Sequence, residues 1–353
     1  MEHDGPLTGW LARVRETGGS DLLLVAGAPP TIRVRGRLQP AADQVLDSDK
    51  IAAATAAFVP PRLSSSFESG AAIDLAFSLA GLGRFRMNLH RERGRVAAAI
   101  RALPTALPAI GGLGFSHDIS LLADLPRGLV LVSGPTGSGK TTTVAAIVAE
   151  LNRRRDGHVI TIEDPVEFEH EHGRCVVEQI EIGVDAESFP VALRSALRQA
   201  PDVIVIGEMR DLESIRIAVS AAETGHLVIA TVHAPDVGGA VSRIADAFPP
   251  ERQSTIRQEL AMGLSAVLTQ SLVRGADGQM VPAGELLMVS YGARQHIRKN
   301  TLQNLHQEMT STRKLGSFTL EESLARLVRS GRIDRPTAAL RAAHVEELDL
   351  LLG

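Results

Sequence analysis

The sequence predicts an α/β protein in which a parallel sheet covered by helices follows a smaller α/β domain. From residue 117 onward, short apolar runs alternate with amphipathic helical segments, which is the pattern of a parallel sheet with helical crossovers. One of these runs, residues 128–133, is followed at once by a glycine-rich loop and then by a helix. The C-terminal part is mostly helical in pattern, so we expect a helical extension after the sheet.

The first 103 residues are expected to form the smaller domain. Leu7, Leu11 and Val14 have helical spacing, and an Ala-rich helix is expected over residues 51–58, stopped by two prolines. An arginine-rich segment then predicts a hairpin that turns near Gly94, and such a cluster usually forms a solvated face or a nucleic-acid patch. The other expected strands lie at residues 21–25, 31–35 and 73–79.

Residues 104–116 are rich in proline and glycine and predict a linker, which leaves residues 117–353 as the second domain. Ser188 and Asp211 are placed to cap helices, and a short final helix is expected to begin at Pro336. A capping box is expected from Thr319 with Glu322. The four expected buried strands lie at residues 128–133, 158–162, 202–206 and 226–231.

Composition narrows the classes of function. A net charge of −4 and an aromatic content of 3% give no general reason to expect a nucleic-acid partner. The single Cys175 excludes an internal disulfide and a multi-cysteine zinc site, and it fits a reducing cytosol. No apolar run approaches the roughly 20 residues that a membrane span needs. We therefore expect no direct membrane span, and any membrane association to be peripheral, through a partner.

Residues 134–141 match the phosphate-loop pattern G-x-x-x-x-G-K-T in full. The glycines let the backbone curl so that its N–H groups point at a phosphate, and the positive end of the next helix faces the same anion. Lys140 supplies charge for the outer phosphates, and the Thr141 hydroxyl is placed to bind Mg²⁺. The residues expected to hold ATP are Gly134, Pro135, Thr136, Gly137, Ser138, Gly139, Lys140, Thr141 and Thr142.

Polar residues follow four of the expected strands. They are the phosphate loop, Glu163, Glu208 and His233. Because the carboxyl ends of parallel strands meet at one edge of a sheet and form its ligand crevice, these residues are expected to converge on one nucleotide.

Hydrolysis of a γ-phosphate needs an oriented water, a metal ion and positive charge. The apolar run that ends in Glu208 resembles a Walker B strand, so Glu208 is expected to hold Mg²⁺ through water. Glu163 is placed to accept the proton of the attacking water, although the residues leave open which glutamate is the base. His233 is expected to sense the γ-phosphate by a hydrogen bond, whereas a lone histidine at a strand end is about as often structural.

At this point the sequence resembles a known family, the type IV pilus retraction ATPases, which are PilT-like members of the secretion-ATPase superfamily. The resemblance covers nearly the whole chain. Its marks are DLLLVAGAPPTIRVRG, GRFRMN, GPTGSGKTTT, TIEDPVEF, ALRQAPDVIVIGEMRD and AAETGHLVIATVHA. The last three resemble the Asp box, the Walker B motif and the His box of that family.

This resemblance implies a hexameric ring motor at the cytoplasmic face of the inner membrane, with a pilus platform protein as its partner. Each subunit would pair a PAS-like N-terminal domain with a RecA-like P-loop NTPase domain. The resemblance also implies that N-terminal arginines reach the γ-phosphate. By motif match this role goes to Arg86 and Arg101, with Arg93 or Arg95 as a third.

The resemblance favours pilus retraction over related outputs. Relatives that extend pili or drive type II secretion usually carry a four-cysteine zinc site, and this chain has one cysteine. Residues 293–309 partly match the helix associated with retraction, with an apolar side and the basic Arg294 and Arg298 elsewhere. Three alternatives stay open: a secretion or pilus-assembly ATPase, a nucleic-acid translocase, and a nucleotide-switched scaffold.

Overall fold

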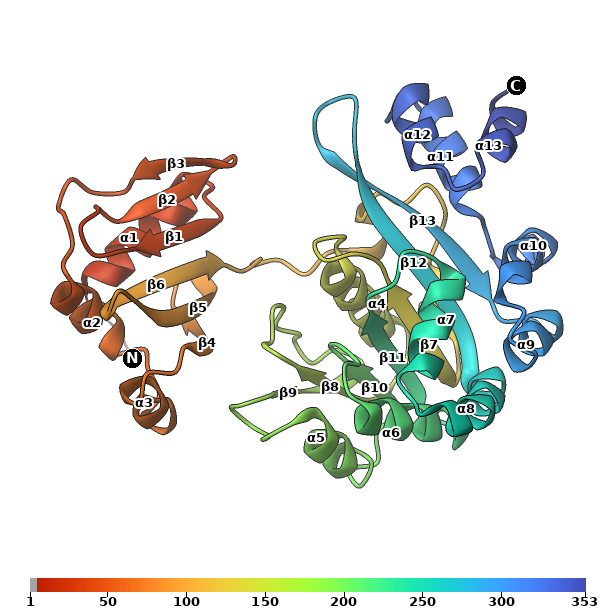
Figure 1. The fold of residues 1–353 in the computed structure, drawn as a ribbon, viewed down its shortest axis with the longest axis horizontal. Helices are drawn as coiled ribbons and strands as arrows, with labels where there is room; N and C mark the ends of the chain where they lie inside the picture. Colours follow the sequence, from red (N-terminus) through yellow and green to blue (C-terminus); the bar gives the residue numbers. More distant parts are fainter. Residues whose placement is uncertain (1–4) are drawn as a thin grey trace. The chain divides into compact units, whose positions relative to one another are not determined.

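The computed structural model describes residues 5–353, which divide into two compact units. The first contains the residues up to Ala106 together with Pro165–Phe168, and the second contains Leu107–Asp164 and Glu169–Gly353. Each unit has its own sheet (Figure 1). Each unit also has its own hydrophobic core. The predicted α/β class is confirmed.

The first unit is a six-stranded antiparallel sheet with the strand order β3-β2-β1-β6-β5-β4, accompanied by three helices. Its strands are β1 (Asp21–Leu24), β2 (Thr31–Val34), β3 (Arg37–Pro40), β4 (Ile73–Leu79), β5 (Gly83–Glu92) and β6 (Arg95–Ala102). Its helices are α1 (Pro6–Glu16), α2 (Ser48–Ala56) and α3 (Pro61–Glu68). The expected hairpin is confirmed, because Arg93 and Gly94 take positive φ angles of 49° and 77° between β5 and β6.

Two details of this unit differ from the prediction. The Ala-rich helix begins before Ile51, because the Asp47 carboxylate accepts a hydrogen bond of 2.8 Å from the backbone N–H of Lys50 and so caps α2. The prolines that end this helical pattern also begin α3, since proline suits the first turn of a helix. Strand β3 was not predicted, and all of its residues are exposed.

The second unit is a seven-stranded sheet with the order β13-β12-β7-β11-β10-β8-β9. Six strands run parallel, and β13 pairs antiparallel with β12. The strands are β7 (Gly128–Ser133), β8 (Gly157–Glu163), β9 (Cys175–Glu181), β10 (Val203–Ile206), β11 (Leu227–Val232), β12 (Leu264–Arg274) and β13 (Met280–Met288). The four predicted strands are present, and β9, β12 and β13 were missed.

Helices cover this sheet and extend beyond it. The α-helices are α4 (Lys140–Arg154), α5 (Phe189–Ala196), α6 (Leu212–Glu223), α7 (Val237–Asp246), α8 (Pro250–Gly263), α9 (Tyr291–Arg298), α10 (Leu305–Ser311), α11 (Leu320–Arg329), α12 (Arg335–Arg341) and α13 (Val345–Leu352). Four short 3-10 helices are η1 (Ile110–Gly112), η2 (Ser120–Asp124), η3 (Leu302–Asn304) and η4 (Arg313–Leu315). No helix among residues 5–353 combines the length and the apolar character that crossing a lipid bilayer requires.

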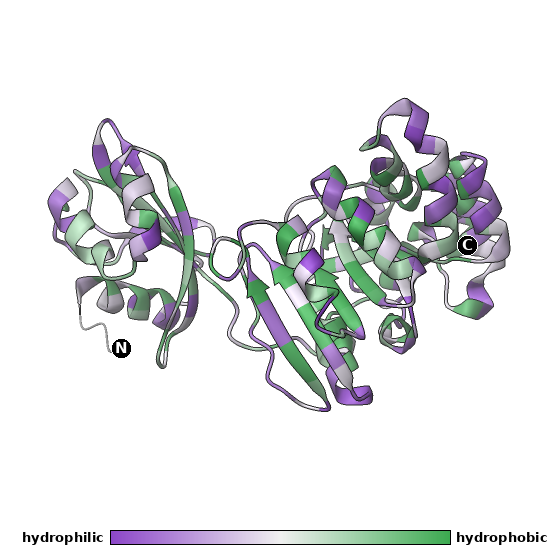
Figure 2. Ribbon diagram, turned by 90° about the horizontal axis from the view of Figure 1, so that it is seen from below, coloured by the Kyte–Doolittle hydropathy of each residue, from purple (hydrophilic) through white to green (hydrophobic). Residues whose placement is uncertain are grey.

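The central strands are apolar on both faces because both faces are covered. Leu129 and Leu131 of β7 belong to the cluster that includes α6, α7 and α8, whereas Val130 and Val132 pack with α4. Every residue of β7, β10 and β11 is buried. A strand buried on both sides reads as a continuous apolar run, which is why these strands were recognisable in sequence. In Figure 2 the helices of this unit carry hydrophilic residues, whereas the central strands are mostly hydrophobic.

The predicted helix ends are largely confirmed. Asp211 caps α6 by accepting from the backbone N–H of Ser214 at 2.8 Å, and Thr319 with Glu322 forms the full capping box of α11. Ser188 is the N-cap residue of α5 as predicted, although its side chain makes no capping hydrogen bond. Pro336 lies in the first turn of α12 as expected, but α12 is not the final helix, because α13 follows it.

The segment 293–309 is not one helix. It contains α9, η3 and α10, and the chain turns after α9, where Asn300 has a φ of 55°. The apolar side was correctly predicted, because Ala293, Ile297, Leu305 and Met309 are all buried in the main core. This segment therefore packs on its own unit.

Arg294 serves this packing. Its guanidinium donates hydrogen bonds to the carbonyl oxygens of Ala261 and Met262 in the last turn of α8. A cation at the C-terminal end of a helix satisfies otherwise unpaired carbonyl groups. Arg298 is exposed on the same helix.

Replacing Arg294 with Ala should destabilise the protein by about 1–3 kcal/mol, because two charge-assisted hydrogen bonds to α8 are lost. Arg298→Ala is the matched control and should change the free energy of unfolding by less than about 0.5 kcal/mol. Urea unfolding followed by circular dichroism measures both. Equal stability of the two variants would show that Arg294 does not hold α9 on α8.

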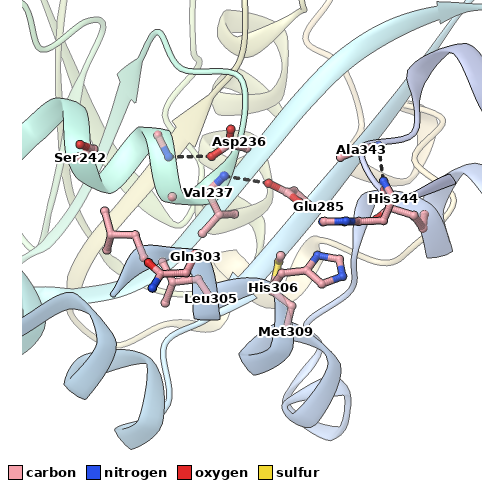
Figure 3. A pocket seen from close by; sticks show the side chains of 14 residues that line it. Asp236, Val237, Ser242, Glu285, Gln303, Leu305, His306, Met309, Ala343 and His344 are labelled. Carbon is pink, nitrogen blue, oxygen red and sulfur yellow. Dashed lines mark hydrogen bonds between the residues drawn. The ribbon is translucent and has the colours of Figure 1, made fainter. Parts of the chain in front are cut away.

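The C-terminal helices enclose a pocket with β13 and α7 (Figure 3). Its volume is about 420 Å³. Glu285 of β13 lies in its wall and accepts a hydrogen bond of 2.7 Å from the backbone N–H of Val237 at the start of α7. His306 and His344 face one another there, with ring centroids 4.3 Å apart.

Candidate active site

Strand register brings the predicted site residues to one edge of the second sheet. The strands β7, β11, β10 and β8 are consecutive neighbours, and all are parallel. Their last residues lie close to one level, since Ser133 pairs with Val232, and Ile206 pairs with both Ala230 and Ile162. The phosphate loop, His233, Glu208 and Glu163 leave the sheet at this edge in that order.

The phosphate loop connects β7 to α4 with a tightly curled backbone. Gly134, Gly137 and Gly139 have φ angles of 144°, 78° and 88°. Gly134 has no room for a side chain, because a Cβ there would lie 2.1 Å from the carbonyl oxygen of Gln270 and 2.6 Å from the Ser138 hydroxyl oxygen. Glycine is therefore required at this position for packing as well as for backbone conformation.

Gln270 of β12 contacts the phosphate loop. It was not predicted as a site residue. Its side-chain Nε2 donates to the carbonyl oxygen of Ser138 at 2.7 Å, and the residue is 2% exposed. The available signal was a polar pair, Thr269-Gln270, inside an otherwise apolar run. From this pair alone, a contact with the phosphate loop could not be inferred, because β12, which pairs with β7 beside the loop, was not predicted.

The Lys140 ammonium group lies inside the loop and is nearly buried. It donates to the carbonyl oxygens of Gly134 at 2.9 Å and Pro135 at 3.0 Å. Its third neighbour is the Nδ1 atom of His233, at 3.4 Å. The loop thus satisfies the buried charge with its own backbone.

His233 connects this lysine to Glu208. Because a charged ammonium can only donate, the imidazole Nδ1 that faces Lys140 acts as the acceptor. The other ring nitrogen, Nε2, then donates to a carboxylate oxygen of Glu208 at 3.1 Å. The second oxygen of Glu208 accepts from the Arg210 guanidinium at 2.7 Å. A continuous polar row therefore joins the phosphate loop to the ends of β11 and β10.

The pKa values of the two groups at the ends of this row are both lowered, for different reasons. Burial lowers the pKa of the Lys140 ammonium, and the nearby Glu208 carboxylate opposes the shift. Burial alone would raise the pKa of Glu208, but the hydrogen bond from Arg210 and the interaction with His233 outweigh it, so its pKa is lowered. Glu208 is therefore held as a carboxylate, which is the form that a metal-bound water would need.

Glu163 stands at the end of β8, next to the strand that leads to Glu208. Its carboxylate accepts from the Thr161 hydroxyl at 2.7 Å and from the Gln179 amide of β9 at 3.1 Å. The backbone of Gly207 packs against it so closely that a Cβ there would lie 3.3 Å from the Glu163 Cα. Glu163 is thus oriented by neighbours other than the Lys140 row. Two residues of the site were not predicted from the sequence. Gln179 lies on β9, a strand that was missed, and the pairing of Arg210 with Glu208 is visible only in the structure.

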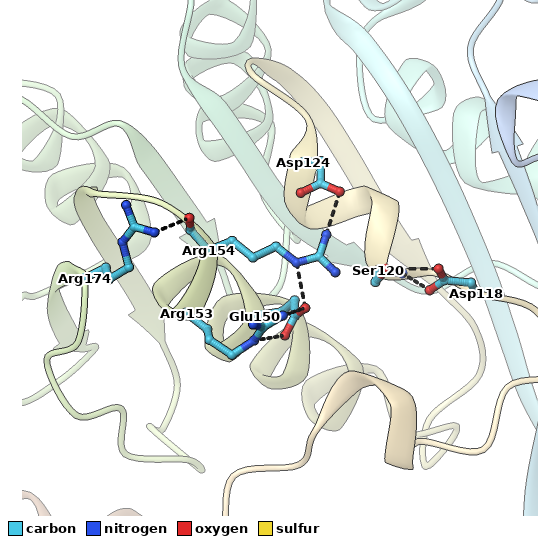
Figure 4. Close-up of polar contacts among 7 residues, drawn as sticks. All are labelled: Asp118, Ser120, Asp124, Glu150, Arg153, Arg154 and Arg174. Carbon is cyan, nitrogen blue, oxygen red and sulfur yellow. Dashed lines mark hydrogen bonds and ion pairs between the residues drawn. The ribbon is translucent and has the colours of Figure 1, made fainter.

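An ion-pair network holds the far end of the phosphate-loop helix (Figure 4). Glu150 of α4 accepts from Arg153 and from Arg154, each at 2.6 Å. Arg154 also donates to Asp124 of η2 at 2.6 Å, and Arg174 donates to the backbone carbonyl oxygen of Arg154 at 2.9 Å. The helix is thereby fixed to the segments before and after it, and the loop at its start is fixed with it.

The loop fits a nucleotide phosphate. The Ser138 hydroxyl oxygen is buried and has no hydrogen-bond partner within the described part of the chain, residues 5–353. A buried polar atom without a protein partner is unusual, and a phosphate oxygen can accept a hydrogen bond from this hydroxyl. Thr141 and Thr142 stand half-buried in the first turn of α4, where the helix dipole favours an anion.

Arg86 and Arg101 belong to the first unit. They are directly paired across β5 and β6, so both project from the same face of that sheet. Each faces a carboxylate: Arg86 lies 3.6 Å from Asp74, and Arg101 donates to Asp21 at 2.9 Å. Their predicted role at the γ-phosphate stays a prediction.

Comparison with known proteins decides the family. The type II/IV secretion system protein family matches residues 111–335. The chain is also 38% identical to the type IV pilus retraction ATPase PilT of Pseudomonas aeruginosa, over 95% of this chain and 98% of that protein. This chain belongs to the type IV pilus retraction ATPase family. The type IV pilus ATPase PilU of the same organism is 36% identical over 96% of this chain and 88% of its own length.

A solved structure of this family gives the same fold. The crystal structure of the pilus retraction motor PilT with bound ADP matches with a TM-score of 0.89 and 37% identity. The match covers 96% of this chain and 98% of that one. The family predicted from the sequence motifs is confirmed.

Gly134→Ala should weaken binding of a fluorescent ATP analogue by at least ~10-fold, about 1.4 kcal/mol, because the new methyl group displaces the loop from Gln270. Gly225→Ala, outside the phosphate loop, is the matched control, since Gly225 also has a positive φ of 114° and a Cβ there meets no described atom within 4 Å. It should cost only the backbone strain, about 1–2 kcal/mol of stability. If the control loses as much affinity as Gly134→Ala, contact with β12 does not shape the loop.

Proposed function

We propose that this chain is an ATP-hydrolysing motor that powers retraction of type IV pili and twitching motility. The observation that carries the proposal is the polar row from Lys140 through His233 to Glu208 beside a complete phosphate loop. Membership of the retraction ATPase family supports the cellular output. In this proposal, binding of phosphate at Lys140 changes the hydrogen bonds of His233 and, through them, those of Glu208.

ATP would bind to the phosphate loop, and Lys140 would exchange the carbonyl oxygens of Gly134 and Pro135 for phosphate oxygens. That exchange releases the Nδ1 atom of His233. A proton taken up from solvent at Nδ1 would make the ring an imidazolium, which would donate from Nδ1 to the γ-phosphate while Nε2 still donates to Glu208. Thr141 and Glu208 would hold a magnesium ion. When bound, this ion supplies positive charge that stabilises the transferred phosphoryl group.

Glu163 and Glu208 divide the remaining work. Glu208 is bonded to Arg210 and His233, which suits a carboxylate that holds metal-bound water in place. Glu163 accepts two hydrogen bonds on one oxygen, Oε1, which fixes its orientation. We assign proton acceptance from the attacking water to Glu163 on this basis.

The proposed motor is a hexamer. Each subunit would use a PAS-like domain of residues 1–103, a linker of residues 104–116 and a RecA-like domain of residues 117–353. It would act from the cytoplasm at the inner-membrane face, against a platform protein of the pilus base. Arg86 and Arg101 would stabilise the γ-phosphate charge, since both lie on one sheet face and remain partly exposed.

Purified protein should release phosphate from ATP, and Lys140→Ala should abolish that release because charge stabilisation at the phosphates is lost. Glu163→Gln and Glu208→Gln should each slow turnover but still bind ATP, since the amide keeps the shape of the side chain. Lys314→Ala, at an exposed site, is the matched control. Parent-level turnover in the Lys140 variant would contradict the proposed site.

The same Lys140→Ala change in cells tests the output. Cells should keep surface pili and lose twitching, because filaments are made but not withdrawn. Loss of surface pili would instead indicate pilus assembly, and normal piliation with normal twitching would indicate a secretion ATPase. Stimulation of the purified enzyme by DNA would favour a nucleic-acid translocase.

Arg86→Ala and Arg101→Ala should lower turnover by roughly 10³-fold, which is the lower range for an arginine finger. Thermal stability should change little, since both side chains are partly exposed and their ion pairs contribute about 0–1 kcal/mol. Arg37→Ala, on the exposed edge strand β3, is the matched control and should hydrolyse ATP at the parent rate. Lower stability with unchanged specific activity would assign both arginines to ion pairing alone.

A further inference from the structure

A cluster of three potential metal ligands lies beside the pocket among the C-terminal helices, and two of the three, His306 and Glu321, line that pocket. His306 comes from α10, Glu321 from α11 and Glu347 from α13. One potential ligand atom of each lies within 4.8 Å of those of the other two. Residues from three separate helices therefore converge on a single point.

Glu321 is the unusual member of this cluster. It is 1% exposed and lines the pocket. One carboxylate oxygen accepts from the backbone N–H groups of Ala343 and His344, each at 2.9 Å. The other oxygen has no hydrogen-bond partner among residues 5–353. A buried carboxylate with one unpaired oxygen is costly unless a cation or a proton completes it.

The other two members are already oriented toward one another. The Nε2 atom of His306 lies 2.6 Å from a carboxylate oxygen of Glu347, and the other oxygen accepts from the Thr319 hydroxyl at 3.3 Å. The bond from Thr319 is of the kind that fixes a metal ligand in place, because it leaves the other carboxylate oxygen of Glu347 available to a metal ion. A metal ion would take the place of the proton that His306 and Glu347 share.

The surroundings of the pocket also favour a cation. Glu285 is almost completely buried in the same pocket, and burial raises its pKa to about 7. The carboxylates of Asp236 and Glu321 add to this rise, against the hydrogen bond from Val237 and the charge of His306. The carboxylates of Asp236, Glu285 and Glu321 thus line one pocket together with the imidazoles of His306 and His344. A divalent ion would neutralise this excess.

We propose that His306, Glu321 and Glu347 bind a divalent transition-metal ion of the zinc class. One imidazole with two carboxylates suits zinc and similar ions, whereas magnesium and calcium prefer oxygen ligands alone. Three protein ligands leave one position for water in a tetrahedral site. The ion would clip α10, α11 and α13 together, and no residue of the phosphate loop lines this pocket.

Metal-free full-length protein should be titrated with zinc chloride without nucleotide, by calorimetry and by thermal unfolding. We expect about one ion per chain and a higher unfolding temperature, because a ligand that binds only the folded state stabilises it. His306→Gln and Glu347→Gln should each weaken zinc affinity by at least ~10-fold and remove the thermal shift. Glu321→Gln should also weaken zinc binding, because it removes a carboxylate ligand. Its fold should be kept, because the amide oxygen still accepts the two backbone N–H bonds.

His296→Gln is the matched control. His296 lies 3.7 Å from Glu308 in the same helical region, and this pair is not part of the three-residue cluster. The control should keep the parent affinity. Should Glu321→Gln fail to fold, the His306 and Glu347 variants decide the matter. Unchanged zinc affinity in those two variants, or an equal loss in the His296 control, would overturn the proposal, as would no zinc binding by the parent protein.

Discussion

The candidate site depends on the hydrogen bonds that pair the buried ammonium group of Lys140. A buried charge must be paired or it destabilises the fold, and here the loop carbonyl oxygens and His233 provide the partners. In the proposed function, phosphate oxygens offer a stronger partner for the same charge. Binding would then change the hydrogen bonding of His233. Because His233 also contacts Glu208, the proposed function would link occupancy of the phosphate site to the hydrogen bonding of that carboxylate.

The sheet makes this linkage possible. β7, β11 and β10 are buried throughout, so a slip of one residue would move each side chain from the core on one face of the sheet to the differently packed core on the other face. The polar residues that follow them are therefore held at one level. β12 adds a second constraint, because Gln270 approaches the loop so closely that only glycine fits at position 134. The network around Glu150 fixes the helix that starts at the loop.

The helical extension is attached to the sheet through buried polar contacts as well as apolar ones. Glu285 of β13 bonds the start of α7, and Glu321 bonds the backbone between α12 and α13. Arg294 does the same for α9 and the end of α8. The proposed metal ion would join α10, α11 and α13 to one another within this extension.

The sequence by itself determined the phosphate loop, the four central strands and the family, because these depend on local pattern. A strand buried on both faces needs a continuous apolar run, and a loop that binds phosphate needs glycines at fixed spacing. Tertiary structure decided the rest. The three strands missed in the sequence lack such a local pattern. β9 is only partly buried, and β12 and β13 lie in a region where the sequence pattern is mostly helical. The roles of Gln270, Arg294 and Glu321 depend on partners far along the chain, and only folding brings such groups within hydrogen-bond distance.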